Sequence, residues 1–402
     1  MFFEYDEKEK TSINDYSWVD GDHLKVSPED FSEIKTKFTK EEYFIHVCSL
    51  IYEHQLPFPY FPYLEAEQKS KFKAFAKSNT TYVKEEWENN LLLTSSKKYR
   101  GSYLMLPTGG MSGNSLSDMF SQKVRLEAIQ KAYVGTHGSI VNVWEYIREH
   151  GKPNKESVRR LLRNAYLEDK INKKTFIRAG RISGQMVTQF RPRIAKDLYN
   201  IFGAKRVLDF SAGWGDRLVG FLASKADSYV GIDPNTKLHD PYRQIVDFYD
   251  TGKSAEFICS PAEEVDYNGI EYDFVFTSPP YFDTEVYSTE ETQSMTKFPK
   301  EDLWKEGFLF NTLTRIYKGL SQGGRIAINI CDNKSFSISN DLIKHMESLG
   351  ATYEGIIGYE INKRPGFVRE RSSVLPRAEP IFIWSKGEAP EPKWYQDNFF
   401  GV

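Results

Sequence analysis

Residues 206–233 read RVLDFSAGWGDRLVGFLASKADSYVGID, and this stretch decides the fold class. Two short apolar runs, 206–212 and 228–233, flank a pair of glycines and a helical pattern over 217–224. An apolar strand, a glycine-containing turn, a helix and a second apolar strand are typical of a βαβ unit, in which the two strands run parallel. The stretch therefore predicts a parallel sheet with helices packed on it.

The same alternation of short apolar runs and helical patterns continues towards residue 386. Further strands are expected at 256–260, 272–277, 325–331, 351–361 and 379–385. Further helices are expected at 241–249, 303–320 and 338–349. No helical pattern separates 351–361 from 379–385, so these two strands are expected to pair antiparallel at the sheet edge. The prediction is an α/β fold with a seven-stranded, mostly parallel sheet and an antiparallel last strand.

The residues that follow the first two strands indicate a ligand site. Open parallel sheets bind ligands outside the carboxyl ends of their strands. Asp209 ends the first run, and Gly213 and Gly215 then allow the backbone to approach a ligand closely. Asp233 ends the second run, about 20 residues further on, where a carboxylate can accept hydrogen bonds from ribose hydroxyls. This pattern predicts a cofactor that carries a nucleoside. It lacks the third glycine of a dinucleotide site and the Lys-Ser/Thr of a phosphate-binding loop.

The fourth strand is followed by the most specific motif in the chain, Ser278-Pro279-Pro280-Tyr281. An exocyclic base amine is a poor nucleophile because its lone pair is delocalised into the ring. Hydrogen bonds from the amine to the Ser278 hydroxyl and to the Pro279 carbonyl would direct that lone pair at a methyl donor, while the prolines fix the backbone. Tyr281 would offer a flat face to a base swung out of a helix. The alternative is a tight Pro-Pro turn with a packed tyrosine.

Ser278-Pro-Pro-Tyr281 resembles the (Asp/Asn/Ser)-Pro-Pro-(Tyr/Phe/Trp) motif of the S-adenosylmethionine-dependent amino methyltransferases. The glycine turn and Asp233 resemble that family's first two motifs, and the resemblance covers residues 206 to about 386. It implies a Rossmann-like methyltransferase sheet, S-adenosylmethionine as the cofactor, and methylation of cytosine N4 or adenine N6. The catalytic residues it implies are Ser278, Pro279, Pro280 and Tyr281. The cofactor-binding residues are Asp209, Ser211, Ala212, Gly213, Gly215, Asp233 and Pro234.

Three more residues are candidates for the cofactor site. After the third strand the family carries an acidic residue, for which Ser260 or Glu263 would substitute here. Upstream, Gln189-Phe190-Arg191-Pro192 resembles the family's phenylalanine-bearing motif near the methionine end of the cofactor, which implicates Phe190. A helix N-terminus with a buried phenylalanine explains the same four residues.

A helical, basic region precedes the sheet. Residues 139–150 carry an apolar stripe, and after a Gly-Lys-Pro-Asn turn a second helix is expected from Lys155, which together form a helix-turn-helix pattern. The polar side of the second helix carries the candidate nucleic-acid contacts Arg159, Arg160, Arg163 and Asn164. The alternative is an ordinary helical hairpin with a solvated basic face.

Charge along the chain is uneven although the net charge of the 402 residues is only −3. Residues 1–60 hold 13 Asp/Glu against 6 Lys/Arg, whereas 151–200 hold 4 against 13. The second segment favours a polyanion-binding patch. No apolar run is long enough to span a membrane and the first ten residues are too acidic for a secretory signal, so an intracellular, cytoplasmic protein without membrane contact is expected. The three separate cysteines favour neither disulfides nor a metal site.

These observations predict four regions: a mainly helical region at 1–130, a basic helix-turn-helix-like region at 131–195, a methyltransferase domain at 196–386 and a tail at 387–402. The function expected is methylation of an exocyclic base amine in DNA, with RNA a possible substrate. The alternatives are an RNA or protein-amide methyltransferase with the same site, and a non-catalytic nucleic-acid-binding protein that keeps the fold.

Overall fold

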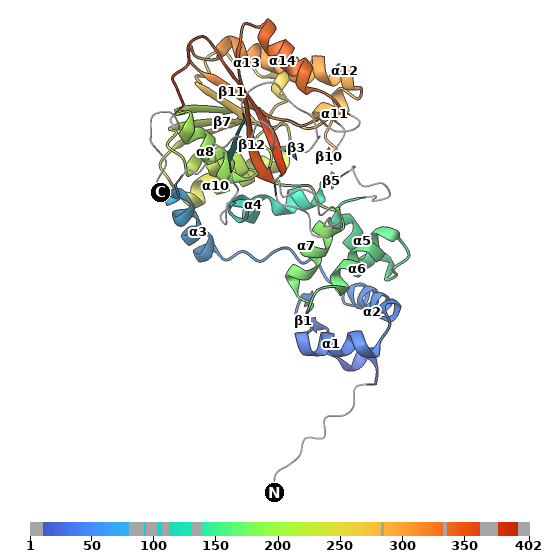
Figure 1. Ribbon diagram of the computed structural model, residues 1–402. Helices are drawn as coiled ribbons and strands as arrows, with labels where there is room; N and C mark the ends of the chain where they lie inside the picture. The colour runs from blue at the N-terminus through green and yellow to red at the C-terminus, as the bar shows by residue number, and fades with distance from the viewer. Residues whose placement is uncertain are drawn as a thin grey trace. The chain divides into compact units, whose positions relative to one another are not determined.

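A mixed sheet organises the larger part of the chain (Figure 1). The computed structural model describes residues 11–79, 92–93, 103–106, 112–130, 138–282, 285–332, 336–361 and 377–392. Within those residues the sheet has nine strands, eight of them in the order β4-β12-β13-β11-β9-β6-β7-β8, and β3 pairs with β13. The strands are β3 (Leu92–Leu93), β4 (Tyr103–Leu106), β6 (Arg206–Asp209), β7 (Ser228–Ile232), β8 (Ser254–Ile258), β9 (Phe274–Thr277), β11 (Arg325–Asn329), β12 (Thr352–Ile361) and β13 (Arg377–Ser385).

The seven strands from β6 onwards that the sequence predicts in this sheet are all present, and the predicted fold class is confirmed. Strands β8, β7, β6, β9 and β11 pair in parallel, and β13 is antiparallel to both of its long neighbours, β11 and β12. The antiparallel pairing of the last two strands is therefore correct, but the β12–β13 pair does not form the edge of the sheet, and β13 lies between β12 and β11. Beyond β12 the sheet continues with β4, which comes from the region before residue 130.

Helices cover both faces of this sheet. On one face lie α8 (Pro192–Ile201), α9 (Asp216–Leu222) and α10 (His239–Tyr249), and on the other α13 (Asn311–Gly319) and α14 (Ser339–Ser348) (Figure 1). The expected helix over 303–320 is interrupted: α12 (Glu301–Trp304) passes into a π-helical segment, η5 (Lys305–Phe310), before α13 begins. Shorter elements of this unit are η3 (Thr236–Leu238), η4 (Ala262–Glu264), β10 (Glu285–Val286) and α11 (Ser294–Lys297).

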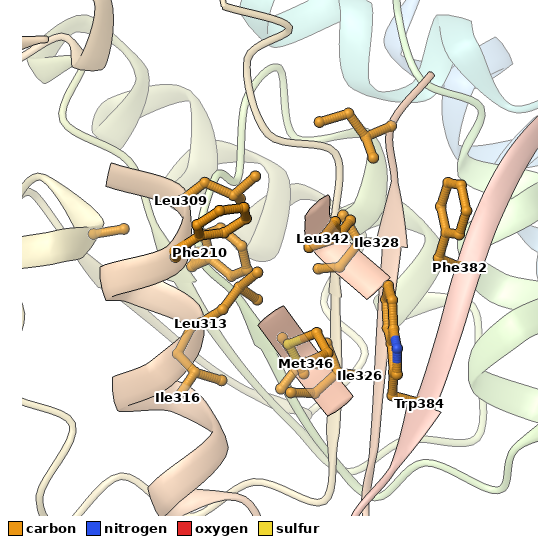
Figure 2. Packing of buried hydrophobic residues seen from close by; sticks show 14 of the residues in the cluster. Phe210, Leu309, Leu313, Ile316, Ile326, Ile328, Leu342, Met346, Phe382 and Trp384 are labelled. Atoms are coloured by element: carbon orange, nitrogen blue, oxygen red, sulfur yellow. The ribbon is translucent and has the colours of Figure 1, made fainter. Parts of the chain in front are cut away.

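Successive side chains of each strand point to opposite faces of the sheet, so one strand contributes to the core on both faces. In β9, Phe274 and Phe276 contact Tyr199 of α8, whereas Val275 belongs to the core on the opposite face. Figure 2 shows that second core, where η5, α13 and α14 pack on β11 and β13. Its labelled residues are Phe210, Leu309, Leu313, Ile316, Ile326, Ile328, Leu342, Met346, Phe382 and Trp384. Strands buried on both faces read as continuous apolar runs, as these do.

The chain divides into two compact units, and each unit combines two separate stretches. One unit holds Tyr63–Val124 with Thr188–Val402, and the other Met1–Pro62 with Arg125–Val187. This division differs from the four regions expected from the sequence. The stretch after residue 62 joins the sheet unit through α3 (Glu65–Lys77) and the start of α4 (Asn114–Glu127). Phe72 of α3 stacks on Tyr249 of α10 with ring centres 4.1 Å apart, and the buried Lys196 ammonium donates to the Phe75 carbonyl at 2.7 Å.

The second unit is helical and has its own apolar core. Its elements are η1 (Ile13–Asp15), β1 (Val19–Asp20), β2 (His23–Leu24), α1 (Pro28–Lys37), α2 (Lys40–Glu53), β5 (Ile129–Gln130), α5 (Ile140–His150), α6 (Glu156–Tyr166) and α7 (Lys173–Ile182). Trp144 of α5 is buried, and its Nε1 donates to the Leu56 carbonyl at 2.9 Å, which ties the two stretches together. Among the described residues no helix has both the length and the hydropathy to cross a membrane.

Candidate active site

The turn between β6 and α9 has the backbone that its glycines predict. Gly213 and Gly215 have φ angles of +59° and +82°, a region that favours glycine. A side chain at Gly215 would lie 2.7 Å from Ile245, so this position is also sterically closed. At Gly213 the nearest atoms to an added Cβ are 3.7 and 3.8 Å away, so the turn is open on that side. The backbone N–H of Gly213 donates to Asp233 at 2.8 Å, which joins the turn to the end of β7.

Asp209 is fully buried, and both of its carboxylate oxygens are engaged within the protein. Oδ2 accepts hydrogen bonds from Arg217 Nε at 2.8 Å and from the Tyr229 hydroxyl at 2.7 Å, and Oδ1 accepts one from the Thr277 hydroxyl at 2.8 Å. Burial alone lowers the pKa of Arg217, but the adjacent Asp209 charge outweighs this and holds that pKa above its ordinary value. Asp209 therefore connects β6, β7, β9 and α9 beneath the glycine turn. The sequence did not identify Arg217, Tyr229 or Thr277 as its partners.

Asp233 has a different environment, one suited to a ligand. Its side chain is 8% exposed and accepts two backbone hydrogen bonds, from Asn235 at 2.9 Å and from Gly213 at 2.8 Å. No described lysine, arginine or histidine side chain forms an ion pair with it. Burial raises the pKa of Asp233 to about 6, although the two N–H donors act in the opposite direction. A buried carboxylate with a perturbed pKa at a strand end is a common feature of functional sites.

The candidates after β8 differ from each other. Ser260 is half-buried at the strand end, and its hydroxyl donates to the Pro261 carbonyl at 3.1 Å. Glu263, in η4, pairs its carboxylate with Lys297 and its carbonyl with Arg315. The Ser260 side chain is therefore the better placed of the two to contact a cofactor, because the Glu263 carboxylate already forms an ion pair with Lys297. Pro234, directly after Asp233, is half-exposed at the same edge of the sheet.

The Ser278-Pro-Pro-Tyr281 loop begins directly after β9, at the same edge of the sheet as Asp233 and the glycine turn. Ser278 is half-buried, and the next residue, Pro279, is buried. The Tyr281 hydroxyl donates to the Glu379 carboxylate and lies 3.3 Å from Asn329 Oδ1. Burial raises the pKa of Tyr281 well above its ordinary value, and the Glu379 charge adds to the effect. The Tyr281 hydroxyl therefore stays protonated and anchors the loop to β13.

Phe190 packs against β9 and β12. Its ring centre is 5.5 Å from those of Phe276 in β9 and Tyr359 in β12, and the Arg217 guanidinium is 5.5 Å from the Phe190 ring centre. The following Pro192 occupies the first turn of α8, as the helix-start interpretation of this segment predicts. Both interpretations of 189–192 are therefore compatible with the structure.

Residues 286–296 lie at the same edge of the sheet, and the sequence did not indicate this. Tyr287 contacts Trp214 of the glycine turn edge-on, with ring centres 5.8 Å apart, and Glu290 accepts a hydrogen bond from the Thr236 N–H at 3.2 Å. The segment therefore lies beside the ends of β6 and β7. Its short polar and aromatic residues carry no recognisable motif, and only the fold brings them to this edge.

In the helical unit both helices that the sequence predicts around the Gly-Lys-Pro-Asn turn are present, as α5 and α6. Gly151, with φ +61°, ends α5, and α6 begins at Glu156, although HTH-like spacing does not by itself establish a nucleic-acid contact. Arg159 forms an ion pair with Glu41 of α2, and Asn164 Nδ2 donates to the Ser183 hydroxyl at 2.9 Å.

The other two candidate nucleic-acid contacts, Arg160 and Arg163, have side chains with weaker interactions inside the helical unit. Arg163 is exposed, 3.6 Å from Glu156, and Arg160 is half-buried. Lys173 also pairs with the acidic segment, through Asp22 at 3.0 Å. Part of the basic charge of 151–200 is thus neutralised by the acidic residues of 1–60, which the uneven charge distribution could have indicated.

Known proteins resemble this chain only weakly. No family model matches the sequence, and no curated protein matches it. A precorrin-6y C5,15-methyltransferase from Geobacter metallireducens is 12% identical, with 45% of this chain and 80% of that chain covered and a TM-score of 0.31. TrmN from Thermus thermophilus is 14% identical, with 49% of each chain covered and a TM-score of 0.34.

An rRNA methylase from Streptococcus thermophilus is 14% identical, with 50% of this chain and 99% of that chain covered and a TM-score of 0.32. All three likenesses are slight. The fold assignment therefore rests on the strand order and on the antiparallel β13 between β11 and β12.

Proposed function

We propose that the protein is an S-adenosylmethionine-dependent methyltransferase that acts on an exocyclic base amine of DNA, at N4 of cytosine or N6 of adenine. The observation that carries the proposal is the Ser278-Pro-Pro-Tyr281 loop, which follows β9 at the sheet edge that also holds Asp233 and the glycine turn. A Pro-Pro turn with a purely structural role would not require this neighbourhood. The anchoring of Tyr281 by Glu379 supports the view that the loop conformation is fixed.

The residues around the glycine turn suit the proposed cofactor. Asp233 is a buried carboxylate without an ion-pair partner among the described residues, which suits two ribose hydroxyl donors, and the open side of Gly213 leaves room beside the backbone. In the proposal Asp233 holds the ribose, residues 211–215 hold the methionine end, and Pro234 and Ser260 border the adenine. Asp209 acts through Arg217 and the turn, because its own oxygens are occupied. When bound, the cofactor supplies an electrophilic methyl group.

The chemistry of this chain's own residues then concerns the amine. The two N–H groups of the amine donate hydrogen bonds to the Ser278 hydroxyl and to the Pro279 carbonyl, which directs the nitrogen lone pair away from the ring. The buried Pro279 and the anchored Tyr281 fix these acceptors before the substrate arrives, so little reorganisation accompanies the reaction. Tyr281 contributes its ring rather than its hydroxyl, since the hydroxyl is already bound to Glu379.

The direct test is methyl transfer from labelled S-adenosylmethionine to duplex DNA, single-stranded DNA, RNA and an unfolded protein mixture in parallel, followed by analysis of the modified nucleosides and amino acids. We expect methylated cytosine or adenine from DNA. Label in RNA or protein alone would replace the DNA assignment with one of the alternative substrates. Cofactor binding without transfer to any of the four would contradict the proposed function.

Cofactor affinity should depend on pH through Asp233. Its pKa of about 6 in the folded protein means that the carboxylate is ionised above pH 6 and protonated below. A protonated carboxyl group loses acceptor capacity, so affinity should fall as the pH decreases through 6, by about tenfold at pH 5. The groups that influence this carboxylate are the N–H donors of Asn235 and Gly213 and the charges of Asp209 and Arg217. Calorimetry between pH 5 and 7 measures the effect.

The control is Asp233→Asn, which should bind the cofactor more weakly and with little pH dependence over the same range. A wild-type affinity that is constant between pH 5 and 7 would exclude Asp233 from the ribose contact.

Nucleic-acid affinity should depend on Arg160 and Arg163 of α6, which interact less strongly with the rest of the protein than Arg159 does. Arg160 and Arg163 are proposed phosphate contacts, whereas Arg159 is already paired with Glu41. Replacing both Arg160 and Arg163 by Gln should flatten the dependence of log affinity on log salt by up to about 2 units. Arg159→Gln should change the slope less. The salt dependence of binding to a labelled duplex measures both.

Arg243→Gln is the matched control, because Arg243 is an exposed arginine of α10 paired with Asp240. It should leave the salt slope unchanged. If the double variant also retains the wild-type slope, the basic face of α6 is simply solvated, and the DNA contacts lie elsewhere.

A further inference from the structure

Helix α7 of the helical unit exposes a row of basic side chains. Its sequence, KKTFIRAGRI, contains four lysine and arginine residues and no acidic residue. Lys174, Arg178 and Arg181 are exposed, whereas residues 175–177 and 179–180 are buried. The three exposed residues are spaced by four and by three positions, which places them on one side of an α-helix. The solvent-facing side of α7 is therefore basic over nearly its whole length.

Two of these three side chains form no ion pair with any residue that the structure describes. They are Arg181 and Lys174, whose Nζ lies 4.9 Å from the ring centre of Phe61. Arg178 pairs with Glu168 at 3.1 Å, but its side chain is 61% exposed, and ion pairs at the surface contribute little. A phosphate group can therefore replace Glu168 at small cost. An exposed positive row of this kind is complementary to a polyanion.

Helix α6 uses part of its polar side differently. Arg159 pairs with Glu41 of α2, and Asn164 Nδ2 donates to the hydroxyl of Ser183, the residue directly after α7. The Ser183 hydroxyl also lies 3.4 Å from the Arg160 carbonyl. These contacts hold α6 against its neighbours. The exposed row of cations belongs to α7.

The buried side of α7 fixes the helix against α5. Phe176 contacts Trp144 of α5 edge-on, with ring centres 4.9 Å apart. A Cβ added at Gly180 would collide with the Ile140 side chain of α5, so the two helices approach closely. The basic row is thus carried by a helix that is packed into the core of its unit, and a rigid element presents contacts more precisely than a loop does.

The dimensions of the row suit the major groove of duplex DNA. From residue 174 to residue 181 the helix rises about 10 Å. The major groove of DNA is about 12 Å wide and admits an α-helix. Ile182, which is 49% exposed, follows the row, and an apolar side chain in this position can contact a thymine methyl group. The major groove of duplex RNA is too narrow for side chains to read, so these features favour DNA.

We propose that α7 enters the major groove of duplex DNA, where Lys174, Arg178 and Arg181 contact phosphates and base edges, while α6 crosses the adjacent backbone. In helix-turn-helix proteins the second helix of the pair lies in the groove and the first crosses the backbone. The DNA-reading pair is then α6 and α7, and not α5 and α6 as the sequence pattern predicts. The inference rests on the proposed function for the choice of DNA as substrate and adds the helix that contacts it.

The test measures the salt dependence of binding to a labelled DNA duplex for the full chain carrying Lys174→Gln and Arg181→Gln. Each of these side chains is expected to neutralise about one phosphate, so the slope of log affinity against log salt should decrease by about 1 to 2 units. The matched control carries Lys25→Gln and Lys37→Gln, which remove the same charge from two exposed lysines of the same unit that have acidic partners. The control should keep the wild-type slope.

An RNA duplex of the same sequence separates entry into the groove from general attraction to phosphate. We expect the double variant to lose affinity for the DNA duplex and to change little on the RNA duplex. An equal loss on both duplexes would overturn the inference, as would a wild-type slope in the double variant or a wild type that does not bind DNA. Arg181→Gln alone should lower the slope by about 1 unit and decides the question if the double variant unfolds.

These results are independent of the methyl-transfer assay, because binding is measured without the cofactor. A protein that binds DNA through α7 and methylates no nucleic acid would contradict the proposed function and support the inference. A protein that methylates DNA and keeps its salt slope in the double variant would support the proposed function and overturn the inference.

Discussion

Asp209→Ala is expected to lower the free energy of unfolding of the sheet unit by about 3–5 kcal/mol, the range for removing one partner of a buried ion pair. The substitution leaves Arg217, which is 4% exposed, with a buried charge and no carboxylate beside it. It also removes the acceptor for the hydroxyls of Tyr229 and Thr277. Chemical denaturation followed by tryptophan fluorescence measures the change.

Asp227→Ala is the matched control. Asp227 is exposed and lies 3.8 Å from Lys205, so its removal should change stability by no more than about 0.5 kcal/mol. If Asp209→Ala is as stable as this control, the network beneath the glycine turn contributes little, and Asp209 is available to serve the cofactor directly.

Ser278→Ala should reduce the rate of methyl transfer about 100-fold or more, the effect of removing one preorganised hydrogen-bonding group from a site of developing charge. Cofactor affinity and folding stability should be unchanged, because Ser278 acts on the amine and makes no contact with Asp233 or the glycine turn in the proposal. Single-turnover kinetics with labelled cofactor measure the rate of methyl transfer, and calorimetry measures cofactor affinity.

Ser348→Ala is the control for the loss of a hydroxyl group. Ser348 is exposed in α14, and its hydroxyl donates to the His345 carbonyl at 2.7 Å. It should retain wild-type activity. Full activity in Ser278→Ala would remove this hydroxyl from the mechanism and leave the Pro279 carbonyl as the proposed acceptor.

The sheet could be predicted from the sequence because its signals are local. The central residues FVF of β9 and IAI of β11 are apolar, as is typical of strands buried on both faces, and turns or helical patterns bound each strand. The position of β13 inside the sheet could not be predicted in this way. Register and neighbour order depend on contacts between segments far apart in the chain, such as Asn329 opposite Ile381.

The residues of the candidate site also fall into two groups, those that local sequence signals predict and those that only the fold brings together. Asp233, the glycines and Ser278 follow strand ends and could be recognised by their position after apolar runs. Glu379 carries no motif, and only the fold brings it beside Tyr281. The sequence indicates Asp209 as a carboxylate at a strand end, but its hydrogen-bond partners are spread from Ser211 to Thr277, so the sequence does not identify them.

The two-stretch construction of each compact unit constrains how the protein can be synthesised and dissected. The chain passes from one unit to the other after Pro62, after Val124 and after Val187. During synthesis on a ribosome, the helical unit cannot complete its core until residue 187 has emerged. Residues 63–124 have by then been synthesised, but the part of the sheet unit that follows residue 187 has not. For the same reason no single cut in the chain yields either unit intact, and separate expression of the helical unit requires its two stretches to be joined by a new linker.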